Sequence, residues 1–206
     1  MLSPTPFHGL PAVLLSADDG ASATIVLQGA HLVSWIPAGG AEWLYVSPRS
    51  PFRAGAPIRG GVPLVFPQFA TYGPLPQHGF ARTQTWRVAA ERDGGVSLRL
   101  DSTDETRALW PHDFAAELAV DIGGDRLGLA LQVRNTGARD FAFTAALHTY
   151  LSVSDIAAIR LDGLAGGAYV DRAANDAPGR ETAASLTVTQ DIDRVYTDLA
   201  PPLRLT

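Results

Sequence analysis

The segment Phe141–Leu151 carries the clearest pair of chemically competent side chains in this sequence. Its alternation of residue types predicts a strand, in which successive side chains point to opposite faces. His148 and Tyr150 then share one face with small residues, and the large apolar residues form the opposite, core-facing side. An imidazole beside a phenol suits a concave ligand-binding surface, and an imidazole can donate and recover a proton near neutral pH. The alternative is a histidine at the margin of a sandwich, satisfied by a backbone carbonyl.

A second candidate is Arg59, in the Gly/Pro-rich loop that runs from Ala56 to Pro67. The two glycines that follow it allow the backbone to bend closely past the guanidinium and aim it. A guanidinium is a forked, charged donor that suits carboxylate and phosphate oxygens. Taken alone, the loop is better explained as a structural turn that happens to contain an arginine.

A third candidate is the run Gln-His-Gly-Phe-Ala-Arg, in which His78 and Arg82 flank a glycine-aromatic pair. Both side chains could face a ligand, one neutral at pH 7 and the other charged. The short His-Gly pair is common, but the full run after a proline-rich loop is more informative than the pair.

The fourth candidate is the extended segment Gln190–Tyr196. Asp191 and Asp193 fall on one side of it, and Arg194 falls on the other. Charged side chains on both sides make this segment a candidate for chemistry. The alternative is an exposed Asp–Arg pair, which contributes only about 0–1 kcal/mol to stability.

Several kinds of chemistry lack their sequence signatures. The chain has no cysteine, which excludes disulfides, thiol catalysis and thiolate metal sites. There is no G-x-S-x-G nucleophile motif, no P-loop and no dinucleotide-binding fingerprint. We therefore expect neither a cofactor nor a metal ion, because none of the five histidines pairs with another at ligand spacing: His8, His31, His78, His112 and His148.

The composition of the chain limits the classes of partner that the protein is expected to bind. The formal net charge is -5, which argues against nucleic acid as a general partner. All 16 basic residues are arginine, a bias that fits either a phosphate-binding surface or the base composition of the coding sequence. No apolar run reaches the ~18 residues of a membrane helix, and the N-terminus lacks the features of a signal peptide. We expect a soluble cytoplasmic protein without a membrane partner.

The elements that must position these residues are short strands separated by glycine turns, which predicts an all-β, antiparallel sandwich or barrel. Between residues 47 and 82 a long Gly/Pro-rich stretch shows no periodicity, and its aromatic, Arg and His content favours an ordered functional loop. Residues 104–111 allow one helical turn at most. The expected strands are 12–16, 23–27, 30–36, 42–46, 85–91, 96–101, 115–122, 127–134, 141–153, 159–162, 185–189 and 203–205.

From about Gly29 onward, the chain resembles the glucose-6-phosphate 1-epimerase (D-hexose-6-phosphate mutarotase) branch of the aldose 1-epimerase family. The resemblance rests on motifs in a fixed order, since each motif alone is common. They are Ile58-Arg-Gly-Gly-Val-Pro63 with Phe66-Pro67, His78-Gly-Phe-Ala-Arg82 with Trp86, Asn135-Thr-Gly137, Ala146-Leu-His-Thr-Tyr-Leu151 and Asp193-Arg-Val-Tyr196.

The resemblance implies a galactose-mutarotase-like β-supersandwich that interconverts the α and β anomers of a hexose 6-phosphate, glucose 6-phosphate first among them. By position, His148 corresponds to the general acid that protonates the ring oxygen. His78 corresponds to a second sugar-binding histidine, and Asp193 to an aspartate that binds sugar hydroxyls. Arg59 and Arg82 correspond to the arginines associated with the phosphate.

One expected residue has no counterpart. The family's general base is a glutamate on a late strand, whereas the last glutamate here is Glu181 and only ten residues follow Tyr196. We expect residues 1–206 to form a single domain that lacks its closing strands, because Leu203–Thr206 resembles the beginning of a strand. Such a domain exposes a sheet edge, so we expect instability or assembly with the missing part. Substitution by another carboxylate, or absence of catalysis, are the alternatives.

Two other functions fit the same residues. The chain could act on a free hexose, or it could be a non-catalytic carbohydrate-binding or regulatory domain that retains the sugar cleft. The sequence leaves open which hexose is preferred and which oligomeric state the protein adopts.

Overall fold

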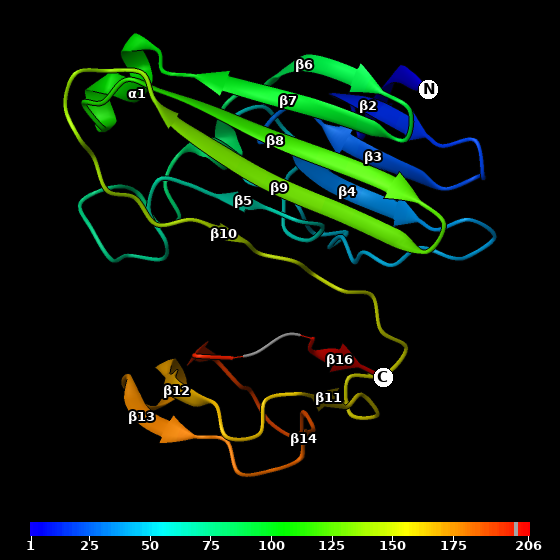
Figure 1. Cartoon of the computed structure of the whole chain (residues 1–206), viewed down its shortest axis with the longest axis vertical. Helices are drawn as coiled ribbons and strands as arrows, with labels where there is room; N and C mark the ends of the chain where they lie inside the picture. The colour runs from blue at the N-terminus through cyan, green and yellow to red at the C-terminus, as the bar shows by residue number, and fades with distance from the viewer. Residues whose placement is uncertain (200–201) are drawn as a thin grey trace. The chain divides into compact units, whose positions relative to one another are not determined.

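The computed structural model describes residues 1–199 and 202–206, and the chain divides into two compact units, Met1–Ser152 and Val153–Thr206. Each unit is built from β-strands and loops (Figure 1). In the described part of the chain, no helix is long and apolar enough to cross a membrane.

The first unit contains two four-stranded antiparallel sheets, ordered β1-β2-β3-β4 and β6-β7-β8-β9, and a two-stranded β5-β10 pair. Figure 1 shows the two larger sheets as the layers of a sandwich. The elements of this unit are β1 (Leu2–Phe7), β2 (Leu10–Ser16), β3 (Ser22–Val26), β4 (His31–Ile36), β5 (Leu64–Val65), η1 (Ala81–Thr83), β6 (Arg87–Arg92), β7 (Gly95–Asp101), α1 (Asp104–Leu109), β8 (Phe114–Gly123), β9 (Arg126–Asn135) and β10 (Ala146–Leu147).

The core of the first unit fills the space between the two large sheets, because alternate residues of their strands point inward. Ile25 of β3, Leu98 of β7 and Val120 of β8 are fully buried there. The long loop contributes as well, since the side chains of Phe66 and Phe80 are buried in this core. The aperiodic loop is therefore an ordered part of the core.

A second apolar cluster covers the other face of the first sheet. Val26 and Val33 pack there with Ile58, and Phe52 packs against them. Residues before Arg59 are thus anchored to the sheet. This anchoring fixes the backbone from which the Arg59 side chain leaves.

The prediction of a strand at residues 42–46 is wrong, since only isolated bridges form there, at Leu44 and Val46. The reason is a side chain: Glu42 Oε1 accepts hydrogen bonds from the backbone N–H groups of Trp35, at 2.9 Å, and Leu44, at 2.8 Å. A carboxylate thus takes the place of the carbonyls that a strand ladder would supply.

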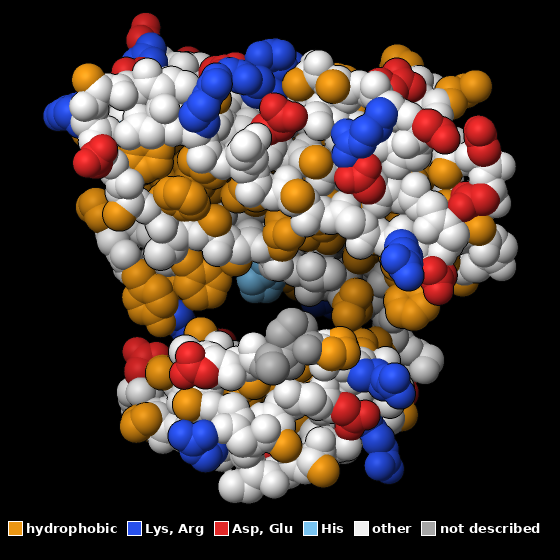
Figure 2. Space-filling view, viewed as in Figure 1, with side chains coloured by type: hydrophobic (Ala, Val, Ile, Leu, Met, Phe, Trp, Pro, Cys, Tyr) orange, Lys and Arg blue, Asp and Glu red, His pale blue; other side chains and the backbone are white. Residues whose placement is uncertain are grey.

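The segment from 141 to 151 also differs from expectation. Only Ala146–Leu147 pairs as a strand, with Leu64–Val65 of β5. Its supposed core face is largely exposed, with Phe143 at 42% and Leu151 at 45% exposure. Apolar side chains gather on this side of the unit in Figure 2, and an apolar groove runs between β9 and the segment.

The second unit is described by itself. It consists of two small three-stranded antiparallel sheets, ordered β14-β11-β16 and β13-β12-β15. Leu164, Gly167 and Glu181 are its buried residues among those described. Its elements are β11 (Leu161–Asp162), β12 (Ala168–Asp171), η2 (Arg172–Ala174), β13 (Ala177–Arg180), β14 (Ser185–Leu186), β15 (Arg194–Thr197) and β16 (Arg204–Leu205).

Candidate functional site

Four of the five candidate residues surround one pocket in the first unit, with a volume of about 350 Å³. They come from three separate parts of the chain: the loop after β4, the loop before η1 together with η1 itself, and the extended segment that contains β10. The pocket is lined by Pro57, Ile58, Arg59, Pro63, Val65, Gln77, His78, Arg82, His148 and Tyr150.

His148 and Tyr150 lie on the same side of the chain, as the alternation predicts. The backbone N–H of His148 donates to Pro63 O at 3.0 Å, and that of Tyr150 donates to Gly61 O at 2.8 Å. These bonds align the segment with residues 61–63, which immediately precede β5. The imidazole and phenol rings consequently stand side by side, with centroids 5.2 Å apart.

The backbone of Arg59 is held on both sides. Its N–H donates to Ser50 Oγ at 2.7 Å, and its carbonyl accepts from the N–H of Ser47 at 2.9 Å. The side chain of Arg59 lines the pocket and is exposed. A rigid backbone with an exposed guanidinium is suited to binding an anion from solution.

The two glycines after Arg59 are required by a close approach to neighbouring backbone. A Cβ on Gly60 would lie 2.3 Å from Tyr45 O, and one on Gly61 would lie 2.2 Å from Leu32 O. Both residues also adopt positive φ. The sequence interpretation had the glycines bending past the guanidinium, whereas in the structure Gly60 packs against the backbone at Tyr45 and Gly61 against that of β4.

A buried histidine supports this loop and was missed as a site-supporting residue. His31 of β4 is 1% exposed, and its Nε2–H donates to Gly60 O at 2.7 Å. Burial is the main cause that lowers the pKa of His31, to about 4; the bond to Gly60 opposes this shift, and the charge of Arg82 adds to it. The ring is therefore neutral at pH 7 with its proton on Nε2. Its position in an apolar strand pattern gave no signal of this role.

His78 and Arg82 are presented by a loop with many backbone bonds. The N–H of His78 donates to Ala70 O at 2.9 Å, and Arg82 Nη2 donates to Gln77 O at 2.8 Å. The rings of His78 and His148 stand 6.0 Å apart in an edge-to-face arrangement. Two imidazoles from distant parts of the sequence are thus neighbours in one pocket.

The pocket carries positive charge. Neither Arg59 nor Arg82 forms an ion pair with any residue that the structure describes, and none of the ten lining residues is acidic. Burial lowers the pKa of the Arg82 guanidinium from its usual value, and the nearby Tyr150 raises it. A half-buried guanidinium without a counter-charge favours binding of an anionic group.

Asp193, the fifth candidate, lies in the second unit. Its side chain is 68% exposed and stands 3.7 Å from Nε of Arg172, whose N–H donates to the Asp193 carbonyl. The role assigned to Asp193 by resemblance stays a prediction.

Glu181 is also in the second unit and has a structural environment. Its carboxylate accepts from the N–H of Ala183, the hydroxyl of Tyr196 and Nη1 of Arg194. The bond from Ala183, with those from Tyr196 and Arg194, holds the pKa of Glu181 below its usual value despite burial. A carboxylate held in this way is poorly suited to serve as a proton acceptor.

No group of three potential metal ligands gathers anywhere in residues 1–199 or 202–206. The donors that converge on the pocket are imidazole, guanidinium and phenol groups, which together suit an anionic, hydroxyl-bearing ligand.

Comparisons with known proteins identify the family of the chain. The aldose 1-epimerase family matches residues 11–200. A protein of Salmonella typhimurium named "putative glucose-6-phosphate 1-epimerase" is 39% identical over 180 residues, which are 84% of this chain and 59% of the relative. A protein of the same name from Cenchrus ciliaris is 35% identical over 98% of this chain and 67% of its own length.

The fold comparison leads to the same family. The crystal structure of a "putative mutarotase" from Salmonella typhimurium matches with a TM-score of 0.87 and 35% identity, over 99% of this chain and 69% of that one. The all-β, galactose-mutarotase-like fold implied by the sequence motifs is confirmed. The chain thus spans about three fifths to two thirds of the length of these relatives, and it belongs to the aldose 1-epimerase family.

Proposed function

We propose that the pocket binds a hexose 6-phosphate and that the protein takes part in interconversion of its α and β anomers. The observation that carries this proposal is the convergence of two imidazoles and two guanidinium groups without an acidic counter-charge in one pocket. The names of the relatives support the same substrate class.

His148 is the proposed acid. As the pyranose ring opens, its imidazolium gives a proton to the ring oxygen, and it recovers that proton when the ring closes on the other face. General acid catalysis of this kind contributes roughly 10²–10⁴-fold to a rate. The imidazole lines the pocket from a backbone held by Pro63, so its position is fixed before a ligand binds.

Arg59 and Arg82 are the proposed phosphate ligands. A phosphate dianion accepts charge-assisted hydrogen bonds from guanidinium groups, which offer paired donors in one plane. The two arginines come from opposite ends of the 59–82 stretch and line the same pocket. Binding at both would orient the sugar by its 6-position and leave the ring near the imidazoles.

Ring opening also needs a base that takes the proton of the anomeric hydroxyl. None of the ten residues that line the pocket is a carboxylate. The proposal therefore assigns the acid and the phosphate ligands to residues of the pocket and leaves the base outside its lining.

The acid assignment is tested by NMR exchange spectroscopy of the two anomers of glucose 6-phosphate. Wild-type protein should accelerate anomer exchange, and His148→Ala should abolish the acceleration while binding persists in calorimetry. His112→Ala, at a histidine outside the pocket, is the control and should behave like wild type. Exchange that is unchanged in His148→Ala would exclude this residue as the acid.

The phosphate assignment is tested by comparing two substrates. Arg59→Ala should weaken binding of glucose 6-phosphate by at least about tenfold, about 1.4 kcal/mol, and leave that of glucose unchanged. Arg49→Ala is the matched control, because it removes one exposed arginine outside the pocket. Equal losses for both sugars in Arg59→Ala would favour a free hexose as substrate.

The second candidate function is sugar binding without turnover, and the absence of a carboxylate from the pocket lining favours it. It predicts that glucose 6-phosphate binds in calorimetry while anomer exchange stays at the uncatalysed rate. Any acceleration that depends on His148 would reject it.

A further inference from the structure

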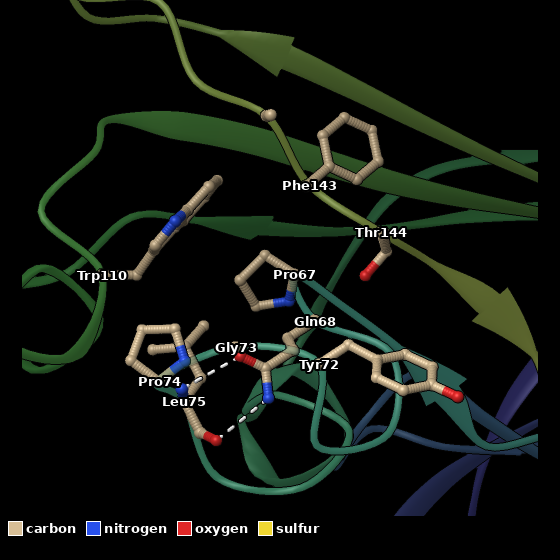
Figure 3. A pocket seen from close by; sticks show the side chains of 10 residues that line it. Pro67, Gln68, Tyr72, Gly73, Pro74, Leu75, Trp110, Phe143 and Thr144 are labelled. Carbon is tan, nitrogen blue, oxygen red and sulfur yellow. Dashed lines mark hydrogen bonds between the residues drawn. The ribbon is translucent and has the colours of Figure 1, made fainter. Parts of the chain in front are cut away.

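The loop that presents His78 is held by a buried glutamine that no sequence motif singles out. Gln68 is 4% exposed, and its side-chain amide is fully engaged with the turn that follows it. Oε1 accepts from the N–H of Leu75 at 3.0 Å, and Nε2 donates to Leu75 O at 3.0 Å and to Ala70 O at 3.3 Å. Figure 3 shows this amide facing Leu75, with Gly73 beside it. Three bonds from one side chain thus fix both ends of the turn.

The same turn holds the His78 ring. The backbone N–H of Ala70 donates to His78 Nδ1 at 3.2 Å, while the N–H of His78 donates to Ala70 O at 2.9 Å. A ring nitrogen that accepts a hydrogen bond from a backbone N–H cannot itself carry a proton. The proton of the neutral ring therefore resides on Nε2.

Ala70 has an unusual backbone conformation that the turn must maintain. Its φ is +50°, in the left-handed region that alanine rarely adopts, and it is buried. Such a conformation persists only where its surroundings hold it. The bonds that Ala70 O accepts from Gln68 and from His78 are the contacts that hold it here.

We propose that Gln68 is a positioning residue that fixes His78 as a neutral Nε2–H donor. It acts through Ala70, by aiming the Ala70 N–H at His78 Nδ1. The consequence for catalysis rests on the proposed function: His78 offers a hydrogen-bond donor to a sugar oxygen and takes no proton from the substrate. Proton exchange is then left to His148.

The bond itself can be observed directly in protein labelled with ¹⁵N, without any sugar. An N–H···N hydrogen bond transmits a scalar coupling between its two nitrogens. Wild-type protein should show this coupling between the Ala70 amide nitrogen and His78 Nδ1, with Nδ1 resonating as an unprotonated ring nitrogen. The His78 ring signals are identified by their absence from the spectrum of His78→Gln. Absence of the coupling, or a protonated Nδ1, in the folded wild type would overturn the inference.

The role of Gln68 is tested by Gln68→Met, which keeps the length of the side chain and removes its amide. The coupling should disappear, and the ¹⁵N chemical shifts of the two His78 ring nitrogens should move toward each other as the two tautomers exchange. Hydrogen exchange at the Ala70 amide should accelerate at least about tenfold. The matched control is Gln28→Met. Gln28 is a second buried glutamine that holds a different loop, through Ala56 O and the N–H of Gly55.

Gln28→Met should leave the His78 signals and the coupling as in wild type. Gly73→Ala is a second, independent variant, because a Cβ there would lie 2.3 Å from Gln68 Oε1 and displace the amide without removing it. It should reproduce the loss of coupling. A coupling that survives in either folded variant refutes the role of Gln68. If wild-type protein shows the coupling but does not accelerate anomer exchange, that result would count against the proposed function alone.

Discussion

His31 makes the stability of the first unit sensitive to acid. Burial lowers its pKa to about 4 in the folded protein, against an ordinary value of 6.5. Between these two pH values the unfolded chain binds a proton that the folded protein does not, so stability falls as the pH falls. The loss is about 1.4 kcal/mol for each pH unit, or about 3 kcal/mol in total between pH 6.5 and pH 4. Well above pH 6.5 neither the folded nor the unfolded chain binds this proton, so this loss of stability is absent.

The substitution His31→Gln separates this effect from the loss of a hydrogen bond. A glutamine Nε2 can also donate to Gly60 O, but it does not titrate. We expect the variant to be somewhat less stable than wild type at pH 7, by about 1–2 kcal/mol, and to lose less stability on acidification. The difference in free energy of unfolding between pH 7 and pH 4.5 should shrink by about 2–3 kcal/mol.

Urea denaturation followed by tryptophan fluorescence measures this quantity for the first unit alone, because all four tryptophans lie within residues 1–152. His8→Gln is the control, since it makes the same change at an exposed histidine. Its pH dependence should follow wild type. If His31→Gln and wild type lose equal stability between pH 7 and pH 4.5, then the buried imidazole is not the source of acid sensitivity.

Three further substitutions test the packing of each unit. In Gly79→Ala, the positive φ alone should cost the first unit about 1–3 kcal/mol. The loss should be larger than this, because the new Cβ would lie 2.2 Å from Phe66 O. Urea denaturation measures the loss, and a midpoint equal to that of wild type would contradict the prediction. Leu98→Ala, at a fully buried core position, should cost about 2–5 kcal/mol in the same assay, and a loss below 1 kcal/mol would mean that the two sheets are not packed through this residue. Arg194→Met should cost the second unit about 3–5 kcal/mol, because it leaves the buried Glu181 without its cation; hydrogen exchange over residues 168–197 should accelerate, and protection equal to wild type would count against the ion pair.

Strand content and the identity of the pocket residues could be predicted from the sequence. The alternation in β7, β8 and β9 is regular, and each observed strand extends the expected one by only a residue or two at its ends. Local propensity and long-range packing agree in these strands. The ordered motifs also pointed to Arg59, His78, Arg82 and His148 before their proximity was known.

Other elements lacked a local signal. β1 contains two prolines, at positions 4 and 6, which argue against a strand. The prolines are tolerated because β1 is an edge strand and pairs only with β2. β12 and β13 lie in a stretch rich in Gly, Ala and Asp, and they are strands because they pair with each other and with β15. Strand formation there depends on partners, which local sequence does not reveal.

The sequence alone determined which side chains are available for chemistry: two pocket imidazoles, two arginines and a tyrosine beside His148. Only the tertiary structure decided how they are held. The backbone at Tyr45 requires Gly60, and the backbone of β4 requires Gly61. The carbonyl of Gly60 places the proton of His31 on Nε2, and the N–H of Ala70 keeps the proton of His78 off Nδ1. Each of these constraints joins segments that meet only when the chain folds, through backbone groups that every residue possesses. The identity of a residue therefore does not reveal which backbone group is its partner.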